Sequence, residues 1–170
     1  NRLFHIVQQM AKVPLHPDQV DNLQMGYLFE HLVMKFNEQA NEEAGDHFTP
    51  REVIELMANL VYTGEKDVYK PGIYRTIYDP TCGTGGMLSV SEQHIRAGNE
   101  AANLALFGQE YNDESWAICC SDMLIKDEET DNIILGDTLG DGKTRDGFEG
   151  HRFHYMLANP PFGVDWKDQK

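Results

Sequence analysis

The sequence predicts an α/β fold in which a parallel sheet follows a helical N-terminal segment. Between residues 73 and 158, short apolar runs alternate with segments of helical periodicity, which is typical of parallel strands joined by right-handed crossovers. Between residues 21 and 62 the periodicity is helical. We therefore divide the chain into a helical segment, residues 1–62, and the first part of a sheet domain, residues 63–170. The 170 residues, 41% of them hydrophobic, suffice for one real core.

The helical segment contains two predicted helices. In the first, residues 21–44, apolar side chains recur every fourth position, at Leu28, Leu32, Phe36 and Ala40. The second begins with a capping box, in which Thr49 is the N-cap, Pro50 the first helical residue and Glu52 the third. Its expected buried stripe is Val53, Leu56, Met57 and Leu60. Such a helix start can also hold an anionic group of a ligand.

The sheet domain contains four predicted strands, at residues 73–78, 104–107, 132–135 and 153–158. The first intervening helix starts near Gly86 and ends by Gly98, a suitable C-cap. The second starts near Asp113 and carries one apolar stripe, made of Trp116, Cys119, Cys120, Met123 and Leu124. Residues 63–72 and 136–150 are expected to be loops, the latter because they are rich in Gly and Asp.

The tetrapeptide Asn159-Pro160-Pro161-Phe162 follows the last strand, at the end where open α/β sheets bind ligands. The Asn159 side-chain oxygen and the Pro160 carbonyl can accept hydrogen bonds from both N–H groups of a planar amine. The prolines hold these acceptors stiffly, and Phe162 offers a face for a base taken out of its stack. The tetrapeptide therefore predicts methylation of a planar amine, although by itself it is also compatible with a Pro-rich turn.

A glycine-rich loop, Asp79-Pro80-Thr81-Cys82-Gly83-Thr84-Gly85-Gly86, joins the first strand to the next helix. Its glycines permit a tight turn and close approach of a ligand. The loop lacks the third glycine of the dinucleotide fingerprint and the lysine of a phosphate-binding loop. It begins instead with the carboxylate of Asp79, which suits an ammonium group and indicates a cofactor with an amino-acid tail.

Two more acidic residues follow the next two strands. Glu110 follows the second strand, where a carboxylate can accept hydrogen bonds from both ribose hydroxyls. Asp137 follows the third strand, where it can bind an adenine amino group. With Asp79 and Asn159, four polar groups follow four successive strands, which favours one ligand site over four unrelated loops. A cofactor with adenosine, an α-amino group and a sulfonium fits this set, so the sequence predicts S-adenosylmethionine.

Five motifs thus follow one another: Phe48-Thr49-Pro50, residues 79–86, Gln109-Glu110, Asp137 and residues 159–162. Their order resembles that of DNA methyltransferases that act on adenine N6. Residues 26–32 and 157–163 are similar almost residue for residue to the modification subunit of type I restriction–modification systems. This resemblance spans residues 19–170 and implies a Rossmann-like, S-adenosylmethionine-dependent methyltransferase fold with a truncated sheet. It also implies a site-specific adenine methyltransferase that acts on duplex DNA by direct in-line displacement.

The resemblance implies a role for each site residue. The target adenine would be bound by Asn159, Pro160, Pro161 and Phe162. The methionine end of the cofactor would be bordered by Asp46, His47, Phe48, Thr49, Pro50 and Arg51. The cofactor loop would contribute Asp79, Thr81, Cys82, Gly83 and Gly85, with Glu110 at the ribose and Asp137 at the adenine edge. His154 stands where an Asp is common in the family, and we interpret it as a packed strand residue. No metal ligand is implied.

Charge and cysteine content indicate the expected partners and compartment. Because the net charge is −14, another part or subunit must supply the cationic surface that grips DNA. In the resembling systems a separate specificity subunit reads the DNA target, and a nuclease subunit can accompany it. The three cysteines, Cys82, Cys119 and Cys120, have no disulfide or metal spacing, which favours a cytoplasmic protein. We expect no membrane span, because no apolar run is long enough.

The chain begins at Asn1 rather than Met and ends at Lys170. We therefore expect a piece of a longer protein that is inactive alone, since family members continue with further strands. Two alternatives remain open. The same chemistry could serve protein glutamine or RNA guanine, although Phe48-Thr49-Pro50 and Phe162 favour DNA. The chain could also be a non-catalytic scaffold, although its intact Asp79 and Asn159 argue against this.

Overall fold

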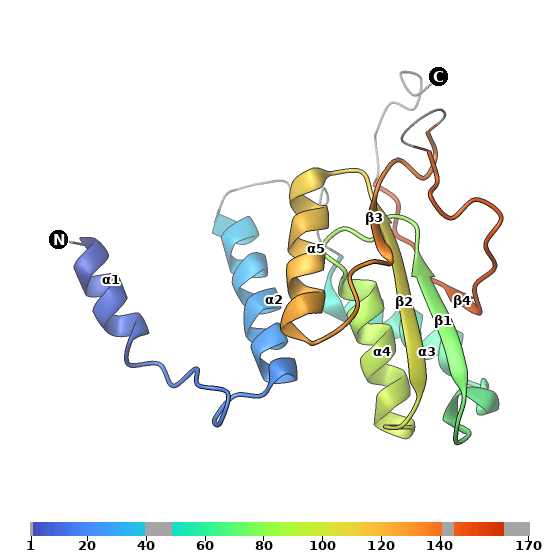
Figure 1. Cartoon of the computed structure of the whole chain (residues 1–170), viewed down its shortest axis with the longest axis horizontal. Helices are drawn as coiled ribbons and strands as arrows, with labels where there is room; N and C mark the ends of the chain where they lie inside the picture. The colour runs from blue at the N-terminus through green and yellow to red at the C-terminus, as the bar shows by residue number, and fades with distance from the viewer. Residues whose placement is uncertain (1, 40–48, 141–144, 162–170) are drawn as a thin grey trace.

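A parallel sheet forms the centre of the structure, a computed structural model that describes residues 2–39, 49–140 and 145–161 (Figure 1). Its four strands are β1 (Tyr74–Asp79), β2 (Asn103–Glu110), β3 (Ile133–Leu135) and β4 (Tyr155–Met156). They lie in the order β3-β2-β1-β4 and every pairing is parallel. The carboxyl ends of all four strands therefore meet at one edge of the sheet, as the strand–helix alternation predicts.

The helices are α1 (Arg2–Met10), α2 (Asn22–Gln39), α3 (Arg51–Tyr62), α4 (Gly86–Gly98) and α5 (Asp113–Ile125), with a short 3₁₀ helix, η1 (Lys66–Tyr69). Because β1, α4, β2, α5 and β3 step across the sheet in one direction, right-handed crossovers place α4 and α5 on the same face. Helix α3 packs against α4, and α2 packs against α5. The hydrophobic core of the structure includes Ile77, Leu88, Leu106, Met123 and Ile133.

The helix α3 buries a largely different face from the one predicted, although Met57 of the predicted stripe is partly buried against the core. Ile54, Ala58 and Tyr62 are buried, whereas Val53, Leu56 and Leu60 of the predicted stripe are 45%, 58% and 71% exposed. The buried side of α3 belongs to the core that also includes Leu88 of α4, against which α3 packs. In α5 the prediction is also wrong at Leu124, which is 66% exposed, while Cys119 and Met123 are buried.

The last strand is shorter than predicted, and His154 lies just before it. The side chain of His154 is exposed, so its interpretation as a packed strand residue is wrong. Its ring Nδ1 accepts a hydrogen bond from the Thr76 backbone N–H at 3.1 Å, and its own backbone N–H donates to Thr76 Oγ1 at 3.0 Å. Side-chain bonds thus replace ladder bonds to β1 at this position. Within the described ranges, no helix has the length and apolar character needed to cross a membrane.

Candidate functional site

A cavity opens at the carboxyl ends of β1, β2 and β4. The sequence-predicted site residues that line it are Thr49, Asp79, Thr81, Cys82, Gly83, Glu110, Asn159 and Pro161. They come from the start of α3, the loop after β1, the end of β2 and the segment after β4. Three of the four polar groups that follow strands, Asp79, Glu110 and Asn159, therefore share one cavity.

Other candidate residues lie elsewhere. Within the described part of the chain, those that do not line this cavity are Pro50, Arg51, Gly85, Asp137 and Pro160. Arg51 lines a second cavity between α2, α4 and α5. Asp137 is buried, and its Oδ1 accepts a hydrogen bond from the Leu139 N–H at 3.1 Å. Asp46, His47, Phe48 and Phe162 lie outside the described residues.

The cavity is also lined by Thr84 and Gly86 of the predicted glycine-rich loop, and by three residues that the sequence did not suggest, namely Ile54, Met87 and Ser115. Ile54, Met87 and Ser115 belong to the first turns of α3, α4 and α5. In an α/β sheet the helix that follows a strand starts beside the carboxyl end of that strand. The first turns of α4 and α5, which follow strands, were therefore the available signal for Met87 and Ser115, whereas α3 precedes the first strand and Ile54 had no such signal.

The carboxylate of Asp79 lines the cavity and is buried. Its side chain accepts a hydrogen bond from the Thr81 N–H at 3.0 Å, and the residue is 2% exposed. Burial, reinforced by the nearby charge of Glu110, raises the pKa of Asp79 to about 7. The ionised carboxylate lacks the stabilisation that water would give it. A cationic ligand beside it would therefore be favourable.

Glu110 joins two loops through its carboxylate. Its Oε2 accepts from the Gly83 N–H and its Oε1 from the Asn112 N–H, both at 2.8 Å. Asn112 in turn caps α5, because its side chain accepts from the Ser115 N–H at 2.9 Å. Each oxygen of Glu110 keeps a further lone pair. The carboxylate is thereby held in one orientation while it can still accept hydrogen bonds from a ligand.

The glycine-rich loop needs its glycines for conformation and for space. Gly83 and Gly85 have φ angles of +54° and +88°, a region that other residues rarely adopt. A Cβ at Gly85 would also lie 2.7 Å from Cys119 Sγ.

The thiol of Cys82 lies in the same loop. A hydrogen bond with Cys119, together with burial, raises the pKa of the Cys82 thiol. Cys82 is therefore a neutral thiol, which gives no support to a covalent enzyme intermediate.

We expect Gly85→Ala to destabilise the fold by about 2–4 kcal/mol, because a positive φ costs about 1 kcal/mol and overpacking adds about 1–3 kcal/mol. Gly64→Ala is the matched control, since Gly64 also has a positive φ, +99°, but has open space around it. It should lose only about 1 kcal/mol. Urea denaturation of both variants measures the difference, and equal losses would contradict the close contact with Cys119.

The side chain of Asn159 is held by Thr49. Asn159 Nδ2 donates a hydrogen bond to Thr49 Oγ1 at 2.9 Å. The predicted capping box is therefore wrong: α3 begins at Arg51, and its N-cap position, Pro50, has no side-chain cap bond. The Thr49 hydroxyl contacts the segment after β4 instead of the helix. This contact leaves the side-chain oxygen of Asn159 as the acceptor available to a ligand.

Two solved structures that are similar to this chain are named as methyltransferases. A type I restriction–modification system methyltransferase subunit from Streptococcus thermophilus matches with a TM-score of 0.66 and 25% identity, over 91% of this chain and 30% of that one. A putative class I S-adenosylmethionine-dependent methyltransferase from Listeria monocytogenes matches with a TM-score of 0.70 at 14% identity, over 91% of this chain and 44% of that one. The chain therefore has a Rossmann-like α/β fold that it shares with these methyltransferases.

The chain belongs to the N-6 DNA Methylase family, which residues 20–170 match. The methylase subunit of the type I restriction enzyme MpnII from Mycoplasma pneumoniae is 30% identical over 157 residues, 85% of this chain and 26% of the relative. That of HindI from Haemophilus influenzae is 27% identical over 153 residues, 88% of this chain and 31% of the relative. The chain thus spans about a quarter to a third of these relatives. The resemblance drawn from the motifs is confirmed.

Proposed function

We propose that the intact protein transfers the methyl group of S-adenosylmethionine to adenine N6 in DNA, as the methylation subunit of a type I restriction–modification system. The observation that carries this proposal is the meeting of Asp79, Glu110 and Asn159 in one cavity. Each of them follows a different strand, and each offers oxygen acceptors of the kind that the reaction needs. Membership of the N-6 DNA Methylase family supports the same reaction.

The donor half of the site fits the cofactor. When bound, S-adenosylmethionine supplies an electrophilic methyl group on a sulfonium. The buried carboxylate of Asp79 would hold the α-ammonium, because its described surroundings provide a backbone N–H and no cation. Glu110 would accept from the two ribose hydroxyls through its remaining lone pairs. Asp137 would bind the adenine edge, and Asp46, His47, Phe48 and Pro50 would border the methionine end.

The acceptor half of the site is the segment after β4. The Asn159 side-chain oxygen and the Pro160 carbonyl would accept the two N–H groups of the target amine, which favours positive charge on N6 as the methyl arrives. Phe162 would stack on the flipped adenine. DNA would be reached through the complex, since a net charge of −14 suits a separate DNA-reading specificity subunit, with or without a nuclease subunit.

The test is a methyl-transfer assay with the full-length protein, its specificity subunit and duplex DNA. With S-adenosylmethionine carrying a tritiated methyl group, we expect the label in N6-methyladenine after digestion of the DNA. DNA that is already methylated at its target adenines is the control and should take up little label. Label in protein glutamine or in RNA guanine would favour the alternative acceptors, and no cofactor binding by calorimetry would favour a scaffold.

A further inference from the structure

Thr49 is placed to choose which end of the Asn159 carboxamide faces the cavity. A carboxamide carries two donors on its nitrogen and an acceptor on its oxygen. Because Asn159 Nδ2 donates to Thr49 Oγ1, the amino end is turned toward α3 and the oxygen is left to accept. If the amide were turned over, its NH₂ group would face the NH₂ group of the target base. Two donors cannot bond each other, so the orientation matters for the reaction.

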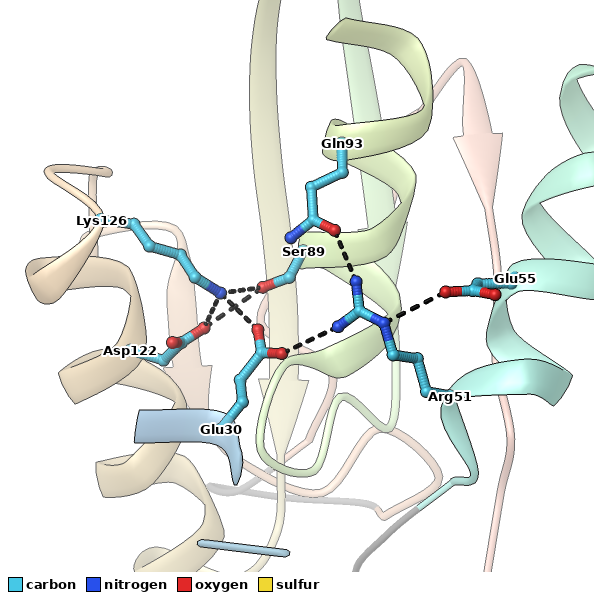
Figure 2. Close-up of polar contacts among 7 residues, drawn as sticks. All are labelled: Glu30, Arg51, Glu55, Ser89, Gln93, Asp122 and Lys126. Atoms are coloured by element: carbon cyan, nitrogen blue, oxygen red, sulfur yellow. Dashed lines mark hydrogen bonds and ion pairs between the residues drawn. The ribbon is translucent and has the colours of Figure 1, made fainter. Parts of the chain in front are cut away.

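The start of α3 is held in place by Arg51. Its guanidinium donates to Gln93 Oε1 of α4 at 2.8 Å, to Glu30 Oε2 of α2 at 3.1 Å and to Glu55 Oε1 of α3 at 3.1 Å (Figure 2). It also lies 5.4 Å from the centre of the Tyr27 ring. These contacts tie the first residue of α3 to α2 and α4. Thr49 lies two residues before this anchoring side chain.

The Glu30 side chain is fixed in turn by a buried lysine. Lys126 Nζ at the end of α5 bonds Glu30, Asp122 and Ser89, and its side chain is 4% exposed (Figure 2). Although burial lowers it, the carboxylates of Asp122 and Glu30 raise the pKa of Lys126, so the ammonium stays charged. A Cβ at Gly26 would collide with this lysine, and the glycine of α2 therefore makes room for it. Polar side chains of α2, α4 and α5 thus form one network of hydrogen bonds and ion pairs that includes Arg51.

We propose that Thr49 is a positioning residue for methyl transfer, which orients the Asn159 carboxamide while Arg51 holds the start of α3. This inference rests on the proposed function and assigns Thr49 a role toward the target base. The alternative is a purely structural contact, in which Thr49 only ties the start of α3 to the segment after β4. The two roles differ in what they predict: loss of a structural contact lowers stability, whereas loss of the orientation of Asn159 lowers the rate.

The test compares Thr49→Val, which removes the acceptor at similar volume, with Thr49→Ser, which keeps the hydroxyl. In the full-length protein with its specificity subunit, Thr49→Val should lower kcat about 10- to 100-fold, the size expected for a misplaced reacting group. KM for DNA, cofactor affinity by calorimetry and Tm should stay close to the wild type. Thr49→Ser should restore kcat to within about threefold, since its hydroxyl makes the same bond.

Thr63→Val is the matched control, because Thr63 is exposed at the other end of α3 and should leave kcat unchanged. A double variant gives the decisive comparison. In an Asn159→Ala background, Thr49→Val should have no further effect on the residual rate. Three results would overturn the positioning role. These are a wild-type kcat after Thr49→Val, a lower Tm or misfolding as its main effect, and an equal loss of rate in the wild-type and Asn159→Ala backgrounds. An inactive wild-type protein would instead overturn the proposed function itself.

Discussion

Asn159→Ala is expected to reduce methyl transfer by the full-length complex about 100- to 1000-fold, the size of effect seen when one preorganised polar group of a reaction site is removed. The alanine leaves N6 of the target adenine without its side-chain acceptor, so charge that develops on the nitrogen is less stabilised. Cofactor affinity should change little, because the donor half is built from Asp79 and Glu110. Single-turnover methylation measures the rate of methyl transfer, and calorimetry measures the cofactor affinity.

Asn103→Ala is the control for this experiment. Asn103 starts β2 at the opposite edge of the sheet and its side chain is exposed, so the variant should methylate DNA at the wild-type rate. If Asn159→Ala retained more than about a tenth of the wild-type rate, a loss of under about 1.4 kcal/mol in transition-state stabilisation, then Asn159 would not be the acceptor for the target amine.

Asp79→Asn is expected to weaken cofactor binding about 100-fold or more and yet to stabilise the cofactor-free protein at pH 8. The loss of affinity follows from removing the buried partner of the α-ammonium. The gain in stability follows from linkage: the folded pKa, about 7, lies above the ordinary value near 4. Folding therefore favours the neutral acid, and stability falls as the pH rises from about 4 to about 7. A neutral amide removes that penalty.

The measurements are calorimetry with S-adenosylmethionine and urea denaturation, each at pH 5.5 and pH 8. The stability advantage of Asp79→Asn should be larger at pH 8 than at pH 5.5. Wild-type affinity should fall about tenfold per pH unit below 7, where Asp79 is protonated, whereas that of the variant should be nearly flat. If the variant were less stable than the wild type at pH 8, the raised pKa of Asp79 would be contradicted.

The grouping of Asp79, Glu110 and Asn159 could be predicted because it depends on a rule of the fold. Apolar runs indicate the strands, parallel pairing aligns their carboxyl ends, and any polar group just after a strand then lies at that edge. The glycine-rich loop could be predicted for the same reason, since a tight turn must join β1 to α4. These inferences need local sequence and topology, but no detailed packing.

Thr49 and Arg51 show what could not be predicted. The local pattern around Thr49 is that of a capping box, and only the distant Asn159 draws its hydroxyl away from the helix. Arg51 was expected at the cofactor, but its partners lie on α2 and α4 as well as on its own helix. Such contacts join residues far apart in the sequence. They depend on how the helices pack against one another, which the periodicity of the sequence does not predict.

The face that α3 buries is another feature that could not be predicted from the sequence. Counting apolar residues favours Val53, Leu56 and Leu60, which are exposed. The buried side contains Ala58, whose small side chain is only a weak apolar signal in the sequence. A single sequence carries no information on which of two partly apolar faces a neighbouring helix will contact.

The contact between Gly26 and Lys126 has a consequence for how sequences of this kind can change. A glycine inside α2 is unfavourable by itself, by about 1 kcal/mol relative to alanine, yet a Cβ there would collide with the lysine. Loss of Lys126 would leave Glu30 and Asp122 without their shared cation. A side chain at position 26 would therefore force Lys126 to move relative to Glu30 and Asp122, so we expect the two positions to vary together among related sequences.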